Sequence, residues 1–167
     1  MNTALDVPLD RLDPNERKFV AAIREHGWFA IHVQEEEGLP GFSYTSGFWL
    51  RFGQPEIIVF ALPRATIHDI LWNMFRDLEA EVRPPQALPV PGVLGNLDAA
   101  FFPVAKRHHA EHLGWSRWFY GGDDFPCLQL VWPDRSNRFP WEPGFDPSML
   151  ASQPDLSEQG WGFTPLA

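Results

Sequence analysis

The sequence predicts a single α+β domain, residues 1–167, with a mostly antiparallel sheet of about five or six strands, two main helices and a proline-rich C-terminal tail. Three observations support this fold class. Residues 28–62 contain three short apolar segments of the kind that form strands. Residues 66–81 carry apolar side chains at helical spacing. The 167 residues, 44% of them hydrophobic, suit one domain with its own core, whose sheet is either open or curled into a barrel-like form.

The first helix is expected over residues 13–26, after a loose lead-in at residues 1–12. Asp13 is a typical N-cap, Pro14 suits the first turn, and Glu16 can complete a capping box. Gly27 is typical of the residue that ends a helix. We expect this helix to lie at an edge of the sheet.

Three strands are predicted next. Residues 28–34 alternate in polarity, which predicts a strand with one buried face. Residues 35–41 combine charge, glycine and proline, so we expect a turn that pairs residues 42–49 with the first strand as an antiparallel hairpin. Residues 57–62 are apolar without interruption, which predicts a strand covered on both faces.

The second helix is predicted to begin at Thr66, with Asp69 three residues later as in a capping box, and to end near Glu81. His68 is expected to be a solvated polar residue. An apolar stripe is expected to face the core, and it consists of Ile67, Ile70, Leu71, Met74 and Leu78.

Residues 83–99 hold four prolines and two glycines, so a helix is excluded there. We expect either a wrapped surface loop or a loop that closes over a binding site. The following segments are predicted as an edge strand at 100–105, one or two helical turns at 108–113, a strand or further turn at 115–120, and an apolar strand at 127–132.

The C-terminal tail, residues 133–167, has too many prolines for regular structure. Its aromatic side chains make it too apolar for a free disordered segment. We expect an extended tail that packs over the domain or onto a partner. The aromatic residues in question are Phe139, Trp141, Phe145 and Trp161.

The net charge of −9 argues against binding to nucleic acid or to an anionic membrane surface. The longest apolar runs are far shorter than the roughly 20 residues of a membrane span, and the N-terminus shows no secretory signal. The expected compartment is therefore the cytoplasm. Cys127 is the single cysteine, so an internal disulfide is excluded and a buried structural thiol is expected.

Tyr44, Thr45 and Ser46 are consecutive hydroxyl residues inside an otherwise apolar strand. Because buried hydroxyls need hydrogen-bond partners, they either bind the backbone or Glu56 and fix the sheet, or contact a ligand. In the second case His32 could face Tyr44 or Ser46 across the hairpin as a titratable group. His32 and the three hydroxyl residues are therefore candidate ligand-binding residues.

Arg135 and Arg138 form a small positive region in an acidic chain, and Trp141 follows them. Arginine suits a carboxylate or phosphate, so these three residues are further ligand-binding candidates. The alternative is a turn in which Asp134 forms a salt bridge with its own arginine. The chain has no glycine-rich phosphate loop of either usual spacing.

His108 and His112 lie four residues apart, so in a helix they share a face and could bind one metal ion. Glu111 is expected on a neighbouring face, and the His-Glu-x-x-His arrangement is not present. A metal site is therefore the weaker alternative to a solvated polar turn. The sequence identifies no cofactor.

Several motifs between residues 24 and 144 together resemble a known family. They are Gly27-Trp28, Phe42-Ser43-Tyr44-Thr45-Ser46-Gly47, Pro55-Glu56-Ile57-Ile58-Val59, Phe119-Tyr120-Gly121, the run from Phe125 to Arg135, and Arg138-Phe139-Pro140-Trp141. The chain resembles the bacterial family catalogued as domain of unknown function 4262, in which Leu usually stands where this chain has Phe48. The resemblance implies no activity, and His108 and His112 lie outside the matching motifs.

The function that the sequence favours is a binding or regulatory module for a protein or small-molecule partner, a second copy of the chain being one such partner. The absence of a recognisable catalytic set favours this hypothesis, as does the excess of eight Trp and 14 Phe over two Tyr, which predicts an aromatic core or groove. The alternative is an enzyme or carrier of the split-barrel kind that binds a flat cofactor such as a flavin. A metal-dependent enzyme using His108 and His112 ranks third.

Overall fold

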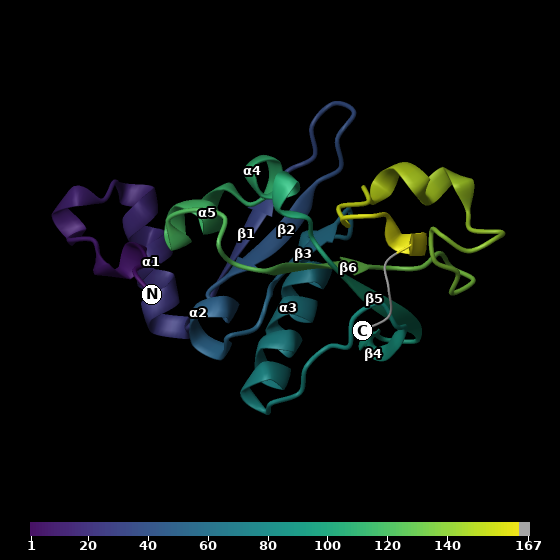
Figure 1. Ribbon diagram of the computed structural model, residues 1–167, viewed down its shortest axis with the longest axis horizontal. Coiled ribbons are helices and arrows are strands. Elements are labelled where there is room, and N and C mark those ends of the chain that lie inside the picture. Colours follow the sequence, from purple (N-terminus) through teal and green to yellow (C-terminus); the bar gives the residue numbers. More distant parts are fainter. Residues whose placement is uncertain (164–167) are drawn as a thin grey trace.

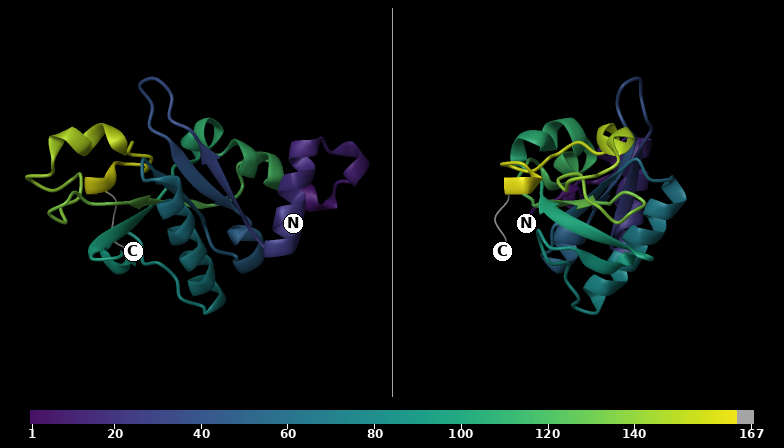
Figure 2. Two further views of the ribbon diagram at one scale, coloured as in Figure 1. Left: turned by 180° about the vertical axis from the view of Figure 1, so that it is seen from behind. Right: turned by 90° about the vertical axis from the view of Figure 1, so that its right-hand side faces the viewer.

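The computed structural model describes residues 1–163, which form a central sheet with helices on both faces (Figure 1, Figure 2). The six strands lie in the order β1-β2-β3-β6-β5-β4. Only β3 and β6 run parallel, while all other neighbours are antiparallel. The strands are β1 (Phe29–Val33), β2 (Phe42–Ser46), β3 (Glu56–Phe60), β4 (Val90–Leu94), β5 (Leu97–Pro103) and β6 (Cys127–Val131). The predicted α+β class is confirmed, and the sheet is open because β1 and β4 are its two edges.

The core consists of two main clusters of buried side chains, one on each face of the sheet. Side chains of α3 pack with Ile57 and Val59 of β3 on one face, and side chains of α1 and α5 pack with Ile58 on the other. Because β3 is buried at every position, the predicted cover on both faces is confirmed for residues 57–60, whereas residues 61 and 62, also expected in this strand, lie beyond it. The helices are α1 (Pro14–His26), α2 (Phe48–Phe52), α3 (Arg64–Glu79), α4 (His109–His112) and α5 (Gly114–Tyr120).

Helix α1 begins and ends as the sequence predicts. The Asp13 carboxylate accepts a hydrogen bond from the Glu16 amide at 2.8 Å, and the Glu16 carboxylate accepts one from the Asp13 amide at 2.8 Å. Gly27 then ends the helix in a left-handed conformation with φ 84°. The helix packs beside the edge strand β1.

The strand predicted over residues 42–49 ends early, at Ser46, and the short helix α2 follows it. Gly47 makes this change of direction with φ 115°, a conformation that residues with a Cβ rarely adopt. A Cβ at this position would lie 2.6 Å from the Gly27 carbonyl oxygen. The turn therefore depends on glycine for both its backbone conformation and its close packing.

Helix α3 begins at Arg64 rather than at Thr66, since Pro63 is its N-cap residue and Thr66 already lies inside the helix. The Ile67 amide donates to the Pro63 carbonyl at 3.0 Å, which closes the first turn. The predicted capping role of Thr66 is therefore wrong. The predicted apolar stripe is buried in full.

Part of the segment 83–99, predicted to be a loop, belongs to a hairpin of β4 and β5. The two strands pair antiparallel with Leu94 opposite Leu97, and Gly95 with φ 71° permits the tight turn between them. Because β4 covers its far side, β5 is not the edge strand that was expected. Residues 115–120, expected either to form a strand or to continue the preceding helical turn, lie in helix α5, so the strand alternative is wrong.

Both ends of the described chain pack on the domain. Residues 1–12, expected to be loose, form two short 3-10 helices, Ala4–Asp6 and Leu9–Arg11, and Ala4 and Leu12 are buried. Beyond β6 the tail contains the 3-10 helices Pro147–Ser152 and Trp161–Phe163, while residues 164–167 of the expected tail lie outside the described part. Within residues 1–163, no helix is both long and apolar enough to cross a membrane.

Candidate functional site

The hydroxyl motif of β2 is held inside the protein by Glu56. The Thr45 hydroxyl donates to the Glu56 carboxylate at 2.6 Å, and the Gly47 and Trp49 amides donate to it at 2.8 and 3.1 Å. The Tyr120 hydroxyl of α5 also donates to this carboxylate. Burial raises the pKa of Glu56, and its hydrogen bonds from Thr45 and Tyr120 oppose that rise.

The neighbouring hydroxyl groups either form hydrogen bonds within the protein, as in Tyr44 and Ser116, or are fully buried, as in Ser46. The Tyr44 hydroxyl accepts a hydrogen bond from the Trp115 amide at 3.0 Å, and burial raises its pKa to about 12. The Ser116 hydroxyl donates to the Thr45 carbonyl at 3.2 Å. Ser46 is fully buried, and its hydroxyl has no hydrogen-bond partner within residues 1–163. Tyr44 and Thr45 thus join β2 to α5, and the three hydroxyl residues line none of the grooves described for residues 1–163.

The sequence suggested that His32 could face Tyr44 or Ser46 across the hairpin, but His32 faces neither of them. In the hairpin register His32 lies opposite Ser43, and its Nδ1 is 2.6 Å from the Ser43 hydroxyl oxygen. Because successive strand residues point to opposite faces, Ser43 and His32 share the face that Tyr44 and Ser46 do not. His32 is therefore directed towards α3, where its ring lies 6.5 Å from that of His68.

Arg135, Arg138 and Trp141 lie in the tail, and none of the grooves described for residues 1–163 brings them together with His32. The suggested salt bridge of Asp134 does not form; its carboxylate instead accepts hydrogen bonds from backbone amides, including that of Arg138 at 3.0 Å. The Arg138 side chain donates to the Gly144 carbonyl. Trp141 stacks on the buried ring of Phe139 at a centroid distance of 4.7 Å.

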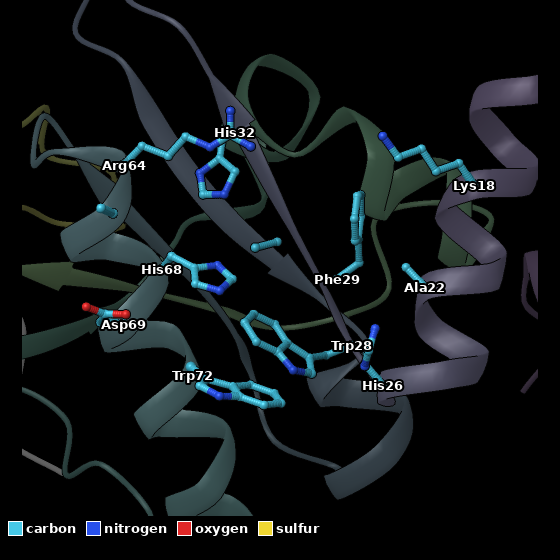
Figure 3. Close-up of a pocket in the computed structure, with 12 residues that line it drawn as sticks. Lys18, Ala22, His26, Trp28, Phe29, His32, Arg64, His68, Asp69 and Trp72 are labelled. Carbon is cyan, nitrogen blue, oxygen red and sulfur yellow. The ribbon is translucent and has the colours of Figure 1, made fainter.

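A groove of about 850 Å³ lies between α1, β1 and α3 (Figure 3). Side chains from all three elements point into it, and its walls are mostly apolar or basic. The residues that line it are Lys18, Ala22, His26, Trp28, Phe29, Ala30, His32, Arg64, Ala65, His68, Asp69 and Trp72.

Trp28 forms the centre of this groove, between His68 and Trp72 of α3 (Figure 3). Its ring is stacked against that of Trp72, with centroids 5.5 Å apart and planes 24° apart, and against that of Phe75. Trp28 is 5% exposed, and its indole Nε1 has no hydrogen-bond partner within residues 1–163. A buried donor without a partner is uncommon in proteins.

Basic side chains enter the groove from both helices. Lys18 comes from α1, Arg64 is the first residue of α3, and neither forms an ion pair within the described part of the chain. His32 lies between them on β1, where burial, Arg64 and His68 lower its pKa and so favour the neutral ring. Asp69 is the one acidic residue in the lining. A groove with this lining suits an anion.

Sequence reasoning found only His32 among these residues. One regular pattern in the sequence could have revealed more of them. Arg64, His68 and Trp72 recur every four residues and so share one face of α3. Trp28 and His32 occupy the same set of alternate positions in the first strand segment, so the sequence could have placed both side chains on one face of that strand. The sequence could not show that these two faces meet.

A second group of polar side chains lies near the other end of β1. His108, Glu111 and His112 each offer one ligand atom, and these atoms lie within 4.8 Å of one another. Glu111 therefore shares the side of the turn occupied by the two histidines, contrary to the expectation that it would lie on a neighbouring face.

The comparisons with known proteins identify a family and no activity. The family described as Domain of unknown function (DUF4262) matches residues 22–146 of the 167-residue chain, a segment that includes the groove residues of β1 and α3 as well as His108 and His112. Neither curated proteins nor solved structures yield a match. Since the match covers most of the chain, the protein belongs to the DUF4262 family.

Proposed function

We propose that the protein is a binding module for a small molecule with a planar unsaturated part and a negatively charged group. The groove between α1, β1 and α3 is the proposed site. In this assignment the planar part packs against Trp28 and Trp72, and the charged group lies between Lys18 and Arg64. The sequence favoured a protein or small-molecule partner of unspecified chemistry, and this proposal specifies a small molecule of one chemical class.

One observation carries this proposal: basic and aromatic side chains converge on one groove of a protein whose net charge is −9. Lys18 and Arg64 are 46 residues apart in the chain, on two different helices, and have no acidic partner in the described structure. Ligand sites combine apolar walls with a few polar groups that fix orientation, which is the combination seen here. Arg64 also adds its charge to the positive end of the α3 dipole.

The test compares two probes of the same shape, naphthoate and naphthamide, by isothermal titration calorimetry. We expect the carboxylate to bind about tenfold more tightly than the amide, because a charged hydrogen bond to Arg64 or Lys18 adds about 1.4 kcal/mol. The variant Lys18→Gln/Arg64→Gln should lose this preference. The matched control Arg83→Gln/Arg135→Gln removes two exposed charges outside the groove and should keep it.

A structural readout accompanies the calorimetry. The indole N–H resonance of Trp28 should shift when naphthoate binds, since this group lacks a partner in the described structure. Equal affinity for the two probes, or a charge preference that survives in the Lys18→Gln/Arg64→Gln variant, would contradict the proposal.

The flavin alternative falls inside the same chemical class, because a flavin nucleotide is both planar and anionic. The split-barrel analogy no longer supports it, since the sheet is open. An ultraviolet–visible spectrum and a native mass spectrum of protein purified without added cofactor distinguish a flavin from other ligands. The same mass spectrum gives the oligomeric state and so tests the hypothesis of a homodimer.

A further inference from the structure

His108, Glu111 and His112 come from one compact turn. The 3-10 helix Lys106–His108 runs directly into α4, so the three side chains follow one another as in a helix and project on the same side. Their ligand atoms lie within 4.8 Å of one another, and no other such group of three occurs within residues 1–163. Ligand atoms of a tetrahedral zinc ion at its usual bond lengths are about 3.4 Å apart. Small rotations of these half-buried or exposed side chains bridge the difference.

A backbone hydrogen bond fixes the tautomer of His112. Its Nδ1 lies 3.2 Å from the His108 carbonyl oxygen, so the hydrogen on Nδ1 is donated to the backbone and Nε2 is left with a free lone pair. Phe42 and Phe60, whose rings pack against each other, both contact the ring, with centroid distances of 5.4 and 5.6 Å. A carbonyl acceptor on the second ring nitrogen is the usual support of a metal-bound histidine.

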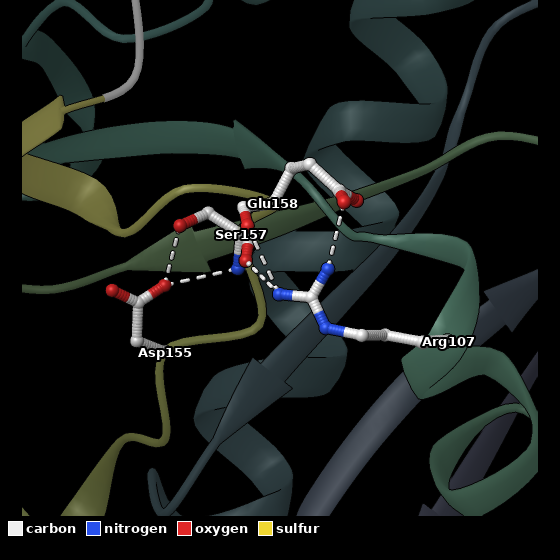
Figure 4. A network of polar contacts seen from close by, with 4 residues as sticks. All are labelled: Arg107, Asp155, Ser157 and Glu158. Carbon is white, nitrogen blue, oxygen red and sulfur yellow. Dashed lines mark hydrogen bonds and ion pairs between the residues drawn. The ribbon is translucent and has the colours of Figure 1, made fainter.

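The cluster opens into a second groove of about 350 Å³, between the β1–β2 hairpin and residues 154–156 of the tail. Arg107 fixes the tail beside the cluster (Figure 4). Its guanidinium donates to the Ser157 carbonyl at 3.1 Å and forms an ion pair with Glu158 at 2.9 Å. Because Arg107 immediately precedes His108, the same turn carries the cluster and the anchor of the tail.

Asp155 lines this groove but does not extend the ligand set. One of its carboxylate oxygens accepts hydrogen bonds from the Ser157 amide and hydroxyl, and the other accepts one from the Trp161 amide at 2.8 Å. The cluster therefore offers two histidines and one glutamate. That is the donor set of zinc sites that keep a coordination position for water or substrate.

We propose that His108, Glu111 and His112 bind one zinc ion or a similar divalent transition metal, with the remaining coordination position facing the groove beside the tail. This site is separate from the groove of α1, β1 and α3. The proposal of a metal site does not depend on the function proposed for that groove.

The experiment measures zinc binding to tag-free, metal-stripped full-length protein by isothermal titration calorimetry. We expect one zinc ion per chain and at least a hundredfold loss of affinity in the His108→Ala/His112→Ala variant. Glu111→Gln should lose about tenfold. The control His26→Ala/His68→Ala removes two exposed histidines elsewhere and should bind zinc like the wild type.

A second measurement reports on the ligands directly. Cobalt added to the wild type should give the intense visible absorption of a four-coordinate site, and the His108→Ala/His112→Ala variant should not. Circular dichroism of each variant without metal checks that the fold is unchanged. Zinc bound with equal affinity by the wild type and the His108→Ala/His112→Ala variant, or affinity lost to the same extent in the control, would overturn the proposal.

Discussion

At the scale of single residues, the carboxylate of Glu56 faces only hydrogen-bond donors. The Thr45 hydroxyl accepts a hydrogen bond from the Ile57 amide at 2.9 Å, and therefore its own hydrogen points to Glu56. The Tyr120 hydroxyl likewise accepts from the Gly47 and Leu50 amides. An ionised carboxylate satisfies all of these groups, whereas a carboxamide would bring its own donor against them.

We therefore expect Glu56→Gln to lower the free energy of unfolding by about 3 kcal/mol, because at least one buried donor is left without an acceptor. Urea denaturation followed by tryptophan fluorescence measures the loss. Glu79→Gln serves as the control, since Glu79 pairs with Arg51 at the surface and should change stability by less than about 1 kcal/mol. Equal stability of the two variants would show that the Glu56 network is not needed.

His32 gives a residue-scale prediction about pH. Burial, Arg64 and His68 lower its pKa, so a nuclear magnetic resonance titration of the folded protein should give a value below 6.5. In the Arg64→Gln variant the value should rise, because a positive charge that disfavours protonation is removed. The unfolded chain binds this proton more readily, so the contribution of His32 to stability is complete above pH 6.5 and is lost as the pH falls through the folded-state value. An unchanged pKa in Arg64→Gln would mean that the two groups do not interact.

At the scale of elements, the junction between β2 and α2 is the most constrained turn of the chain. We expect Gly47→Ala to lower the free energy of unfolding by more than about 2 kcal/mol, because both its φ of 115° and its contact with the Gly27 carbonyl resist a Cβ.

Gly53→Ala is the matched control for this junction. Gly53 also has a positive φ, 63°, but a Cβ there would meet nothing within 4 Å. Its substitution should cost only the backbone preference, about 1 kcal/mol. Thermal unfolding of the two variants measures the difference, and equal losses would exclude a steric role of the Gly47 contact.

At the scale of the whole molecule, a buried glutamine attaches the tail to the sheet. Gln129 of β6 donates to the Pro154 carbonyl at 2.7 Å and accepts from the Leu156 amide at 3.2 Å. Gln153 makes a similar exchange with the backbone of Trp132. These contacts place Leu156 in the core and the tail beside the His108 cluster.

We expect Gln129→Leu to loosen this attachment, because two backbone groups of the tail lose their partners. Hydrogen exchange followed by mass spectrometry should show peptides that cover residues 153–158 exchanging at least about tenfold faster, with little change in α3. Gln34→Leu, at an exposed position, should leave the tail unchanged. Exchange in the tail that is unaffected by Gln129→Leu would mean that aromatic packing alone holds it.

Much of the fold could be predicted because its signals are local. The capping box at Asp13, the glycine after α1 and the apolar stripe of α3 each depend on residues within a few positions of one another. The errors arose where a distant group decides the local structure. Residues 47–49 leave the strand because Glu56 binds their amides, and residues 90–94 pair with β5 although their composition is typical of a loop.

The α+β class, the main helices and the apolar strands could be read from the amino-acid sequence, because the period of apolar residues follows from backbone geometry alone. Only the tertiary structure decided that β3 and β6 pair in parallel and that α1, β1 and α3 enclose one groove. The physical reason is that periodicity marks which face of an element is apolar but not which element covers it. Lys18, Trp28 and Arg64 therefore belong to one site through packing contacts between segments that are far apart in the chain.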